Sequence, residues 1–457
     1  MSKSVKTWLH KNAPDWRKIL YNIVLVILLP IVALYLLWRL VVQGKSRAGL
    51  AQRLGILPDS VSKLKDADGC IIWVHAVSVG EVAAAEPILQ QLRLAEPTGQ
   101  IVLSTTTPTG HKMAEKLGLD VEALIYFPFD FPGITERVLR TIGPDLIILM
   151  EGELWPNLLA AARARNIPTA VVNARISDTA FPKNQLLRPL FAWTLSNVNL
   201  VCAQSQKDAD RFVALGAPPQ RVKVSGNSKF DENFPHIPPE EGAKWRQDLG
   251  LRQQSPILIA GSTHPGEDEQ ILDAFDQLRA NHPDLELVIA PRHPERGDEI
   301  EKLISERGYA TYRRSRVLAE LEQGKAIDLR STTQVRVVIL DTIGELGRIF
   351  SIATVVFMGG SLVPRGGHNI LQPLAQGKPV IFGPHMRNFQ DIADVALQRQ
   401  AAIQVQDARE LFEVTDRLLS SKAERELYQS KGRSLLQEQS GASQRIVKEL
   451  APLLPQQ

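Results

Sequence analysis

Short apolar runs rich in β-branched residues recur in the first half of the chain, and stretches with helical spacing separate several of them. These runs cover residues 69–78, 100–107, 123–129, 144–151, 167–175 and 198–205. Strands that alternate with helices predict βαβ units, in which helices cover both faces of a parallel sheet. We therefore expect an α/β domain over residues 49–232.

A second series of apolar runs follows at residues 255–263, 285–293, 335–341, 353–361 and 378–384. Between the two series lies Asn233–Trp245, a proline-rich and charged stretch typical of a linker. We predict a linker over residues 233–246, a second α/β domain over residues 247–425, and helices after Asp407. Ligands of such domains bind outside the carboxyl ends of the parallel strands, so we expect the functional residues in a cleft that the two domains face.

The N-terminal region departs from this rhythm. Ile19–Val42 is a continuous apolar run with a single charge, Arg39, and with Pro30 as a source of a kink. As a helix it reaches about 36 Å, enough to cross a hydrocarbon core of about 30 Å. The run predicts a retained membrane anchor within residues 1–48, because it is too long for the apolar part of a signal peptide. Basic residues on both flanks leave its orientation open and also fit a helix that lies in one leaflet.

Composition excludes several classes of protein. The 457 residues are 44% hydrophobic and 23% charged, as in an ordinary globular protein. Basic and acidic residues number 53 and 50, a balance that argues against a nucleic-acid partner. Cys70 and Cys202 are too far apart in the sequence to indicate a zinc site or a disulfide framework.

The segment HAVSVGE, residues 75–81, places a carboxylate at a strand-to-helix junction. Ser78 and Glu81 have the spacing of a capping box, which stabilises the start of a helix. The local pattern favours this interpretation, and the rest of the chain has to decide whether the carboxylate has a further role.

Other strands of the first domain also end in polar groups. EGELWPN, residues 151–157, follows one strand, NARIS, residues 173–177, follows the next, and Lys229 lies near the end of the last. Glu151 taken alone also fits a helix start, and Lys229 also fits a solvated surface lysine. A basic and apolar stretch, Phe181–Leu195, is either a lipid contact made through Lys183 and Arg188 or an ordinary packed helix.

The strand ends of the second domain are rich in glycine and basic residues. They comprise residues 261–269, 290–296, 341–347 and 358–373, with Arg292 and His293 among them. Glycine lets a backbone approach a ligand closely, free amides at helix starts bind phosphate, and arginine pairs with phosphate charge. A nucleotide pocket explains these segments together.

The motifs HAVSVGE, STTTPTG, MEGELWPN, NARIS, GNSKFD, STHPGE, PRHPER, DTIGELG, FMGGSLVPRGGHN and FGPHMRNFQD occur in this order from one end of the chain to the other. In this set and order the chain resembles the 3-deoxy-D-manno-octulosonic acid (Kdo) transferases of lipopolysaccharide synthesis. The resemblance implies a GT-B fold, with two Rossmann-like domains facing a cleft and a C-terminal helix, residues 426–457, that returns to the N-terminal domain.

The same resemblance implies an inverting glycosyltransferase that needs no metal and no cofactor. CMP-Kdo is then the donor and the lipid A precursor, lipid IVA, is the acceptor. A sugar-nucleotide donor and a lipid acceptor place the catalytic domains on the cytoplasmic side of the inner membrane, in contact with membrane lipids.

By resemblance, Glu81 is the general base, and Glu151 and Lys229 stabilise the transition state. The expected contacts to CMP are Pro291, Arg292, Ile343, Gly344, Glu345, Asn369, Ile370, Leu371 and Gln372. Two positions depart from the family pattern: Gly152 stands where a threonine is usual, and Gln372 where a glutamate is usual. The second departure removes a charged acceptor for the ribose hydroxyls. The nearest alternatives are a GT-B enzyme with another nucleotide sugar and lipid, and an inactive nucleotide-sugar-binding homologue.

Overall fold

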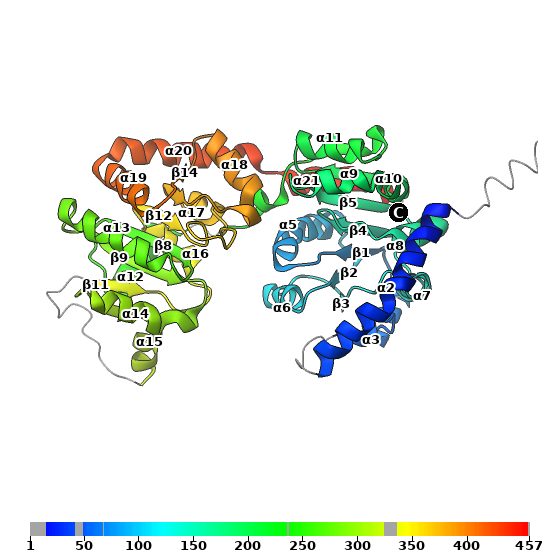
Figure 1. The fold of residues 1–457 in the computed structure, drawn as a ribbon, viewed down its shortest axis with the longest axis horizontal. Helices are drawn as coiled ribbons and strands as arrows, with labels where there is room; N and C mark the ends of the chain where they lie inside the picture. The colour runs from blue at the N-terminus through cyan, green and yellow to red at the C-terminus, as the bar shows by residue number, and fades with distance from the viewer. Residues whose placement is uncertain (1–14, 42–48, 67, 235–236, 324–335, 456–457) are drawn as a thin grey trace, which may run out of the picture. The chain divides into compact units, whose positions relative to one another are not determined.

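The structure, a computed structural model, describes residues 15–41, 49–66, 68–234, 237–323 and 336–455 (Figure 1). The chain divides into two compact units. Unit 1 comprises Met1–Glu232 together with Gln439–Gln457, and unit 2 comprises Asn233–Glu438. The chain therefore leaves unit 1 once and returns to it with its last residues.

Unit 1 is built on a parallel sheet of seven strands. They are β1 (Ile71–His75), β2 (Gln100–Thr105), β3 (Ala123–Tyr126), β4 (Leu146–Met150), β5 (Thr169–Ala174), β6 (Leu200–Ala203) and β7 (Val222–Val224), in the order β3-β2-β1-β4-β5-β6-β7. Since β1 pairs with both β2 and β4, the strand order reverses between β1 and β4. In open α/β sheets, ligands bind beyond the carboxyl ends of the strands at such a reversal.

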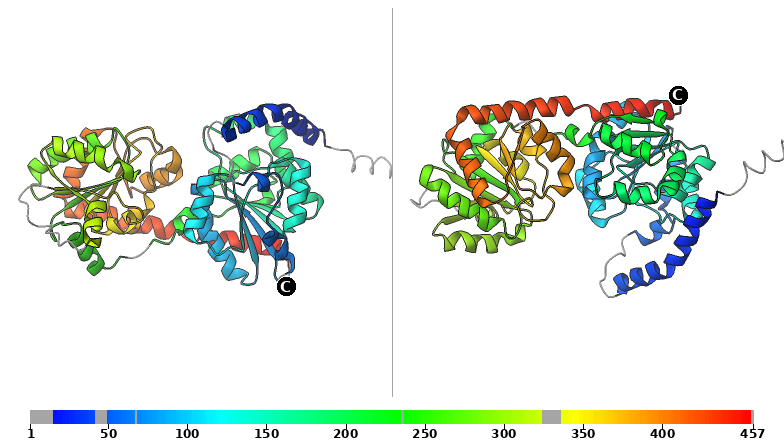
Figure 2. Two further views of the ribbon diagram at one scale, coloured as in Figure 1. Left: turned by 90° about the horizontal axis from the view of Figure 1, so that it is seen from below. Right: turned by 45° about the horizontal axis from the view of Figure 1, so that its top comes forward.

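Helices lie on both faces of this sheet, as the left-hand view of Figure 2 shows. They are α3 (Leu50–Arg53), α4 (Asp59–Ser62), α5 (Val79–Ala95), α6 (Pro108–Leu117), α7 (Pro132–Ile142), α8 (Pro156–Ala164), α9 (Phe181–Leu186), α10 (Arg188–Ser196), α11 (Gln206–Ala214) and α21 (Ala442–Leu450). Every residue of β1 and β4 is buried, as the continuous apolar runs predict. Helix α21 adds Ile446 and Leu450 to the core beside Ile72 and Val74.

Helix α2 (Trp16–Val41) is docked on unit 1 by polar contacts. The Tyr21 hydroxyl donates to Asp130 over 3.0 Å, and the amide groups of Asn22 and Asn157 exchange hydrogen bonds of 2.9 and 3.1 Å. Asp130 also accepts from the backbone amide of Asn157 at the start of α8. Two side chains inside the long apolar run thus bind partners in unit 1.

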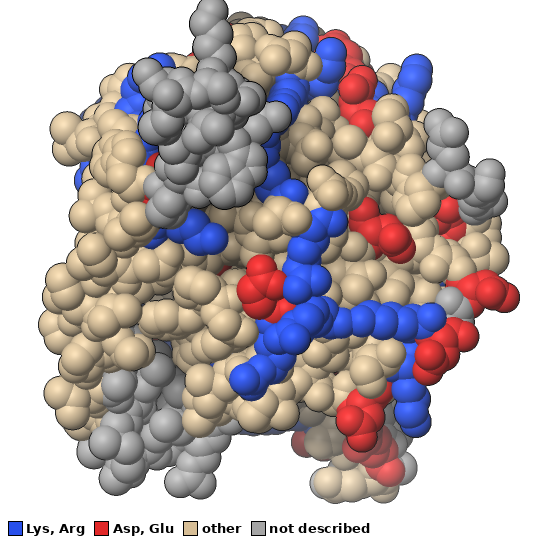
Figure 3. All heavy atoms as spheres, turned by 90° about the vertical axis from the view of Figure 1, so that its right-hand side faces the viewer, with Lys and Arg blue, Asp and Glu red and all other residues tan. Residues whose placement is uncertain are grey.

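The remaining surface of α2 is apolar and exposed. The exposed residues include Ile19, Leu20, Ile23, Val24, Val26, Ile27, Leu28, Leu29, Ile31 and Leu34. Figure 3, which views the α2 side, shows broad uncharged areas with Lys and Arg side chains running between them. Within the described residues, no helix has both the length and the apolar character that a membrane crossing requires. This finding does not support the predicted membrane anchor, and residues 1–14 and 42–48 of that prediction lie outside the described chain.

Unit 2 contains a second parallel sheet of seven strands. They are β8 (Ile257–Thr263), β9 (Glu286–Pro291), β10 (Ala310–Arg313), β11 (Arg336–Ile339), β12 (Val355–Met358), β13 (Val380–Phe382) and β14 (Ile403–Gln404), in the order β10-β11-β9-β8-β12-β13-β14. Its helices are α12 (Pro239–Asp248), α13 (Asp268–Asn281), α14 (Gly297–Glu306), α15 (Arg314–Glu322), α16 (Leu346–Ile349), α17 (Leu371–Ala375), α18 (Gln390–Gln398), α19 (Ala408–Ser420) and α20 (Lys422–Gln439). Here the strand order reverses between β8 and β12.

The predicted linker, residues 233–246, contains the start of a helix, and residues 235–236 lie outside the described chain. Helix α12 begins at Pro239, where proline lacks only a hydrogen bond that the first turn does not make. Glu240 and Glu241 in its first turn favour the positive end of the helix dipole. The same prolines and charges that indicate a linker are therefore a helix start.

Candidate active site

Glu81 lies in the first turn of α5, directly beyond the carboxyl end of the central strand β1. Its carboxylate accepts from the backbone amide of Val77 over 2.9 Å and from the hydroxyl of Ser78 over 3.1 Å. The Ser78 hydroxyl makes no capping bond to a backbone amide, so the reciprocal capping box does not form. Two of the four lone-pair positions of the Glu81 carboxylate remain open to another partner.

The environment of Glu81 makes its carboxyl group an unusually weak acid. Burial is the main cause, and the negative charges of Glu151 and Glu153 add to it. Together they raise the pKa of Glu81 from 4.5 to about 7, although Val77 and Ser78 favour the ionised form. A general base works best when its pKa is near the working pH, so the position suits proton acceptance.

Glu151 follows β4, the strand beside β1, and is held by two cations. Its carboxylate binds Lys229 Nζ over 3.1 Å and Arg175 Nε over 2.7 Å. Burial raises the pKa of this carboxyl group, but Lys229 and Arg175 outweigh that effect and leave the pKa below its ordinary value. Glu151 is therefore ionised beside Glu81, which explains why the two neighbouring carboxyl groups titrate so differently.

Lys229 is buried, with 7% of its surface exposed, so it is not the solvated surface lysine of the alternative interpretation. It lies in a short 3-10 helix, Ser228–Asp231, whose first amides are held by side chains. Asn227 Oδ1 accepts from the Lys229 amide, and Asn173 Oδ1 accepts from the Ser228 amide, both over 3.0 Å.

Two of these residues have a strained backbone. Glu151 has φ 54° and Asn173 has φ 49°, in the left-handed region that non-glycine residues rarely adopt. Asn173 also lies where the pairing of β5 with β6 shifts register. Such strain costs about 1–3 kcal/mol per residue and concentrates at functional sites. Both residues belong to motifs named in the sequence analysis, but those motifs do not predict a left-handed backbone conformation.

A cavity of about 240 Å³ adjoins Glu151 and is lined also by Gly152, Arg175 and Phe191. A Cβ atom at position 152 would lie 3.2 Å from the carbonyl oxygen of Arg175, which is a tight contact.

The stretch next to this cavity, residues 181–195, contains both exposed and buried side chains. Leu186 is 83% exposed, whereas Trp193 is buried, so only part of the stretch faces solvent.

In unit 2, the glycine-rich segment after β12 is occupied by a carboxylate from the same unit. Glu267 accepts from the backbone amides of Gly360, Ser361 and Leu362 over 2.6, 2.9 and 2.9 Å. It also accepts from the amide of His264 over 3.0 Å. These amides are not free to bind phosphate, so the expectation that they do so is wrong. The sequence analysis included Glu267 in the motif STHPGE but interpreted that segment as part of a nucleotide pocket and did not predict this role.

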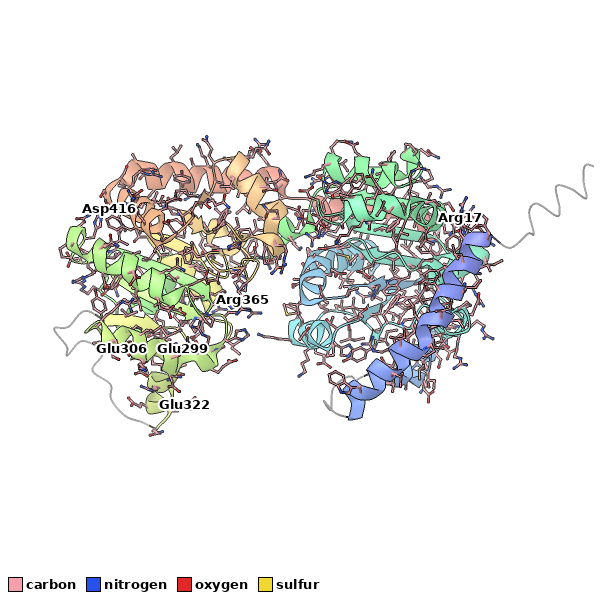
Figure 4. All side chains as sticks on the ribbon, viewed as in Figure 1. Arg17, Glu299, Glu306, Glu322, Arg365 and Asp416 are labelled. Carbon is pink, nitrogen blue, oxygen red and sulfur yellow. The ribbon has the colours of Figure 1, made fainter. Side chains whose placement is uncertain are left out.

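A histidine pair lies beside this segment. Nε2 of His264 and Nε2 of His368 are 3.0 Å apart, and the two rings stack with centroids 5.2 Å apart. Burial, with Arg292 and His264 next in effect, lowers the pKa of His368 to about 4. Burial lowers the pKa of His264 as well, and the charges of His293 and Arg365 add to this effect. Both imidazole rings are therefore neutral at pH 7. Arg365, labelled in Figure 4, is exposed in the turn that follows β12 and precedes His368.

The predicted donor residues lie at the carboxyl ends of β9, β11 and β12. Pro291 ends β9, and the Arg292 amide donates to the Thr263 carbonyl over 3.0 Å. Glu345 pairs with Arg314 over 3.1 Å, so its carboxylate is already committed to a partner. Ile343 is 74% exposed at the same edge, beside Gly344 with φ 98°.

Residues 369–372 form the start of α17. Asn369 Oδ1 accepts from the amide of Leu371 over 2.9 Å, which stabilises the turn into the helix. Ile370 and Leu371 are fully buried, so neither residue exposes atoms to a ligand in this structure. The Gln372 Oε1 atom lies 3.7 Å from the Cβ position of Gly347, and a longer residue there would crowd it.

Two units that each carry a parallel seven-stranded sheet, with polar groups at the strand ends, define the two-domain α/β class to which GT-B glycosyltransferases belong. Comparison with known structures agrees on the fold. UDP-GlcNAc 2-epimerase from Neisseria meningitidis matches with a TM-score of 0.55 at 13% identity, over 84% of this chain and 100% of that chain.

Comparison of sequences gives the family. The pattern of the family described as 3-deoxy-D-manno-octulosonic-acid transferase (kdotransferase) matches residues 48–232. The 3-deoxy-D-manno-octulosonic acid transferase of Haemophilus influenzae is 34% identical over 96% of this chain and 99% of that protein. That of Bordetella pertussis is 35% identical over 82% of this chain and 86% of that protein. The chain therefore belongs to the Kdo transferase family and is a glycosyltransferase.

Proposed function

We propose that the protein transfers Kdo from CMP-Kdo to lipid IVA, with inversion at the anomeric carbon and without a metal ion. The observation that carries the proposal is the pair of neighbouring carboxyl groups with opposite pKa shifts. Glu81, with a pKa of about 7, is suited to exchange a proton, and Glu151, paired with Lys229 and Arg175, stays ionised.

In this reaction an acceptor hydroxyl oxygen forms a bond to the anomeric carbon of Kdo as its proton passes to the carboxylate of Glu81. The bond from that carbon to the phosphate oxygen of CMP breaks, and CMP leaves with the electron pair. Positive charge develops on the sugar ring, and negative charge develops on the leaving phosphate. Glu151 and Lys229, which are fixed by each other, stabilise these charges without having to reorganise.

On the donor side we propose that CMP contacts the residues beyond β9, β11 and β12. Arg292 offers a guanidinium to the phosphate, and the turn around Gly344 and the start of α17 hold the nucleoside. Because Glu267 fills the amides of residues 360–362, phosphate binding relies on side chains more than on that loop.

We place this reaction on the cytoplasmic side of the inner membrane, in lipopolysaccharide synthesis, because the donor is a nucleotide sugar and the acceptor a membrane lipid. The exposed apolar residues of α2 and the exposed Leu186 support contact of unit 1 with lipid.

The direct test is turnover of radiolabelled CMP-Kdo on lipid IVA by the purified protein. Transfer of label to the lipid, competed by CMP and not by UMP or UDP, supports the proposal. Competition by UMP or UDP instead would favour the alternative, a transferase for another nucleotide sugar.

The pH dependence of catalysis follows from Glu81. A base must be deprotonated to accept a proton, so kcat/KM should rise about tenfold per pH unit below pH 7 and level off above it. The measurement is kcat/KM from about pH 5.5 to about pH 9, with stability checked at each pH. A profile that is flat through pH 7 would contradict the assignment of Glu81 as the base.

Gln372→Glu should strengthen donor binding. A glutamate offers a charged acceptor to the ribose hydroxyls, and the gain of a charge-assisted hydrogen bond corresponds to about a fivefold lower KM for the donor. The kcat should change little, because a contact made equally in the ground and transition states affects KM alone. Gln398→Glu, at an exposed position in α18, is the matched control. An unchanged KM would show that the ribose is held elsewhere.

A further inference from the structure

A second cavity lies in unit 2 at the amino ends of β12 and β13, whereas the proposed donor residues lie beyond the carboxyl ends of the strands. It has a volume of about 780 Å³ and is lined by parts of α12, α17 and α20 and by the segments before β12 and β13. Figure 1 labels these three helices on unit 2. Residues 369–372 begin α17, and Ala375–Lys378, at the other end of that helix, line the cavity. The cavity is therefore separate from the proposed donor site.

Three cationic side chains line this cavity: Arg246, Lys378 and Arg433. No carboxylate is among the described residues that line it. Burial, followed by the charges of Arg246 and Arg433, lowers the pKa of Lys378 to about 8, which shows that the cations repel one another. Glu286 is a counter-charge for Arg246 but does not line the cavity, so an anion bound among the three cations would relieve their mutual repulsion.

The three cations differ in how they are held. Arg246 is fixed by the carbonyl oxygens of Arg252, Ser255 and Ile352 at 2.9 to 3.1 Å. Arg433 reaches over Gly377, where a Cβ atom would lie 3.4 Å from its guanidinium. Among the described residues, neither Lys378 nor Arg433 has an ion-pair partner within 4.0 Å. Lys378 and Arg433 can therefore each form an ion pair with an anionic ligand.

The rest of the lining suits an organic molecule that carries the anion. Ile237, Pro238, Ile352 and Ala375 give apolar walls. The hydroxyl of Ser351 is shielded from solvent and has no hydrogen-bond partner among the described residues. The volume lies within the range of about 300–1,000 Å³ that small-molecule sites occupy.

We propose that this cavity is a binding site for a phosphate ester, whose phosphate lies between Lys378 and Arg433 with Arg246 behind it. The guanidinium of Arg433 supplies a planar pair of donors, and Lys378 supplies a point charge. The ligand is a monoester whose organic part contacts the apolar walls. It is either free in solution or the headgroup of a lipid.

The test is calorimetric titration with glycerol 3-phosphate and with vesicles of phosphatidylcholine that contain phosphatidic acid, at constant ionic strength. Both probes present a phosphomonoester, one in solution and one at a lipid surface. The full-length protein carries Arg292→Gln throughout, so that the donor-side guanidinium does not contribute. Binding of the first probe identifies a soluble ligand. Binding of the vesicles alone identifies a lipid only as far as Arg433→Gln and Lys378→Met weaken it, because the exposed apolar residues of α2 are also proposed to contact lipid.

Arg433→Gln and Lys378→Met should each weaken binding about tenfold or more, since each removes a charge-assisted hydrogen bond to the phosphate. Arg409→Gln, which removes an exposed arginine of α19, should leave binding unchanged and is the matched control. Melting temperatures of the variants separate loss of binding from loss of folding. Arg246 is not substituted, because its bonds to three carbonyl groups hold the fold. Absence of binding to both probes, or equal binding by Arg433→Gln and Arg409→Gln, would overturn the proposal.

Discussion

Glu81→Gln should abolish most of the turnover and leave the protein folded. Glutamine has nearly the same shape but cannot accept the proton of the acceptor hydroxyl, so turnover should fall by about 10²–10⁴-fold. The Val77 amide can donate to the amide oxygen of the glutamine, and the Ser78 hydroxyl can accept from its NH2 group, so both contacts can be kept. The measurement is turnover and melting temperature on the same purified variant.

The raised pKa of Glu81 also predicts the direction in which this substitution changes the stability of the protein. Because the folded-state pKa of Glu81 is raised from 4.5 to about 7, its contribution to stability is fully present below pH 4.5 and is lost as the pH rises through 7. At about pH 8 the native protein therefore bears the cost of a buried carboxylate, which the glutamine variant avoids. We expect the variant to melt no lower than the native protein at that pH.

Glu86→Gln on the same helix is the matched control, because it neutralises a carboxyl group of α5 that makes no bond to the Val77–Ser78 turn. Its turnover should be close to normal. A stable Glu81→Gln protein that retains more than about a tenth of normal turnover would exclude Glu81 as the base.

Lys229→Met should reduce both stability and turnover. Glu151 would keep Arg175 but lose its buried lysine partner, and breaking a buried ion pair costs about 3–5 kcal/mol. Loss of a fixed electrostatic group near the reacting atoms should lower turnover by about 10²–10³-fold. Urea unfolding measures the first effect, and the lipid transfer assay measures the second.

A double variant separates the two effects. Adding Glu151→Gln to Lys229→Met removes the buried carboxylate that has lost its lysine, so stability should largely return, while turnover stays low because both proposed stabilising groups are gone. Lys223→Met, at an exposed position in β7, controls for loss of a lysine and should change stability by less than about 0.5 kcal/mol. Recovery of turnover in the double variant would show that Glu151 and Lys229 act only by stabilising the fold.

The sequence predicted the central strands well because they are buried on both faces. A strand such as β4, with every residue inside, must be apolar along its whole length. The edge strands β10 and β14 were not predicted, since β14 has two residues and β10 carries half-buried polar positions. Neither strand needs a continuous apolar run.

The site was predicted in part. Motif order placed Glu81 and Glu151 beyond β1 and β4, and pairing of those strands brings the two carboxyl groups near each other. The glycine-rich segment suggested backbone amides that are free to bind phosphate. The sequence did not predict that the amides of residues 360–362 donate to the carboxylate of Glu267. For α2, a count of apolar residues predicted a membrane anchor, but it did not predict that Asn22 donates to Asn157, more than a hundred residues later. Hydrogen bonds between distant segments are outside the reach of local pattern.

The return of the chain to unit 1 sets an order for its synthesis and folding. Ile446 and Leu450 belong to the same core cluster as Ile72 and Val74, yet they leave the ribosome after the whole of unit 2. Unit 2 is continuous in sequence and can fold as soon as it has emerged. Unit 1 keeps part of its apolar core open until the segment that follows unit 2 has been synthesised. The N-terminal unit is therefore expected to complete its folding after unit 2.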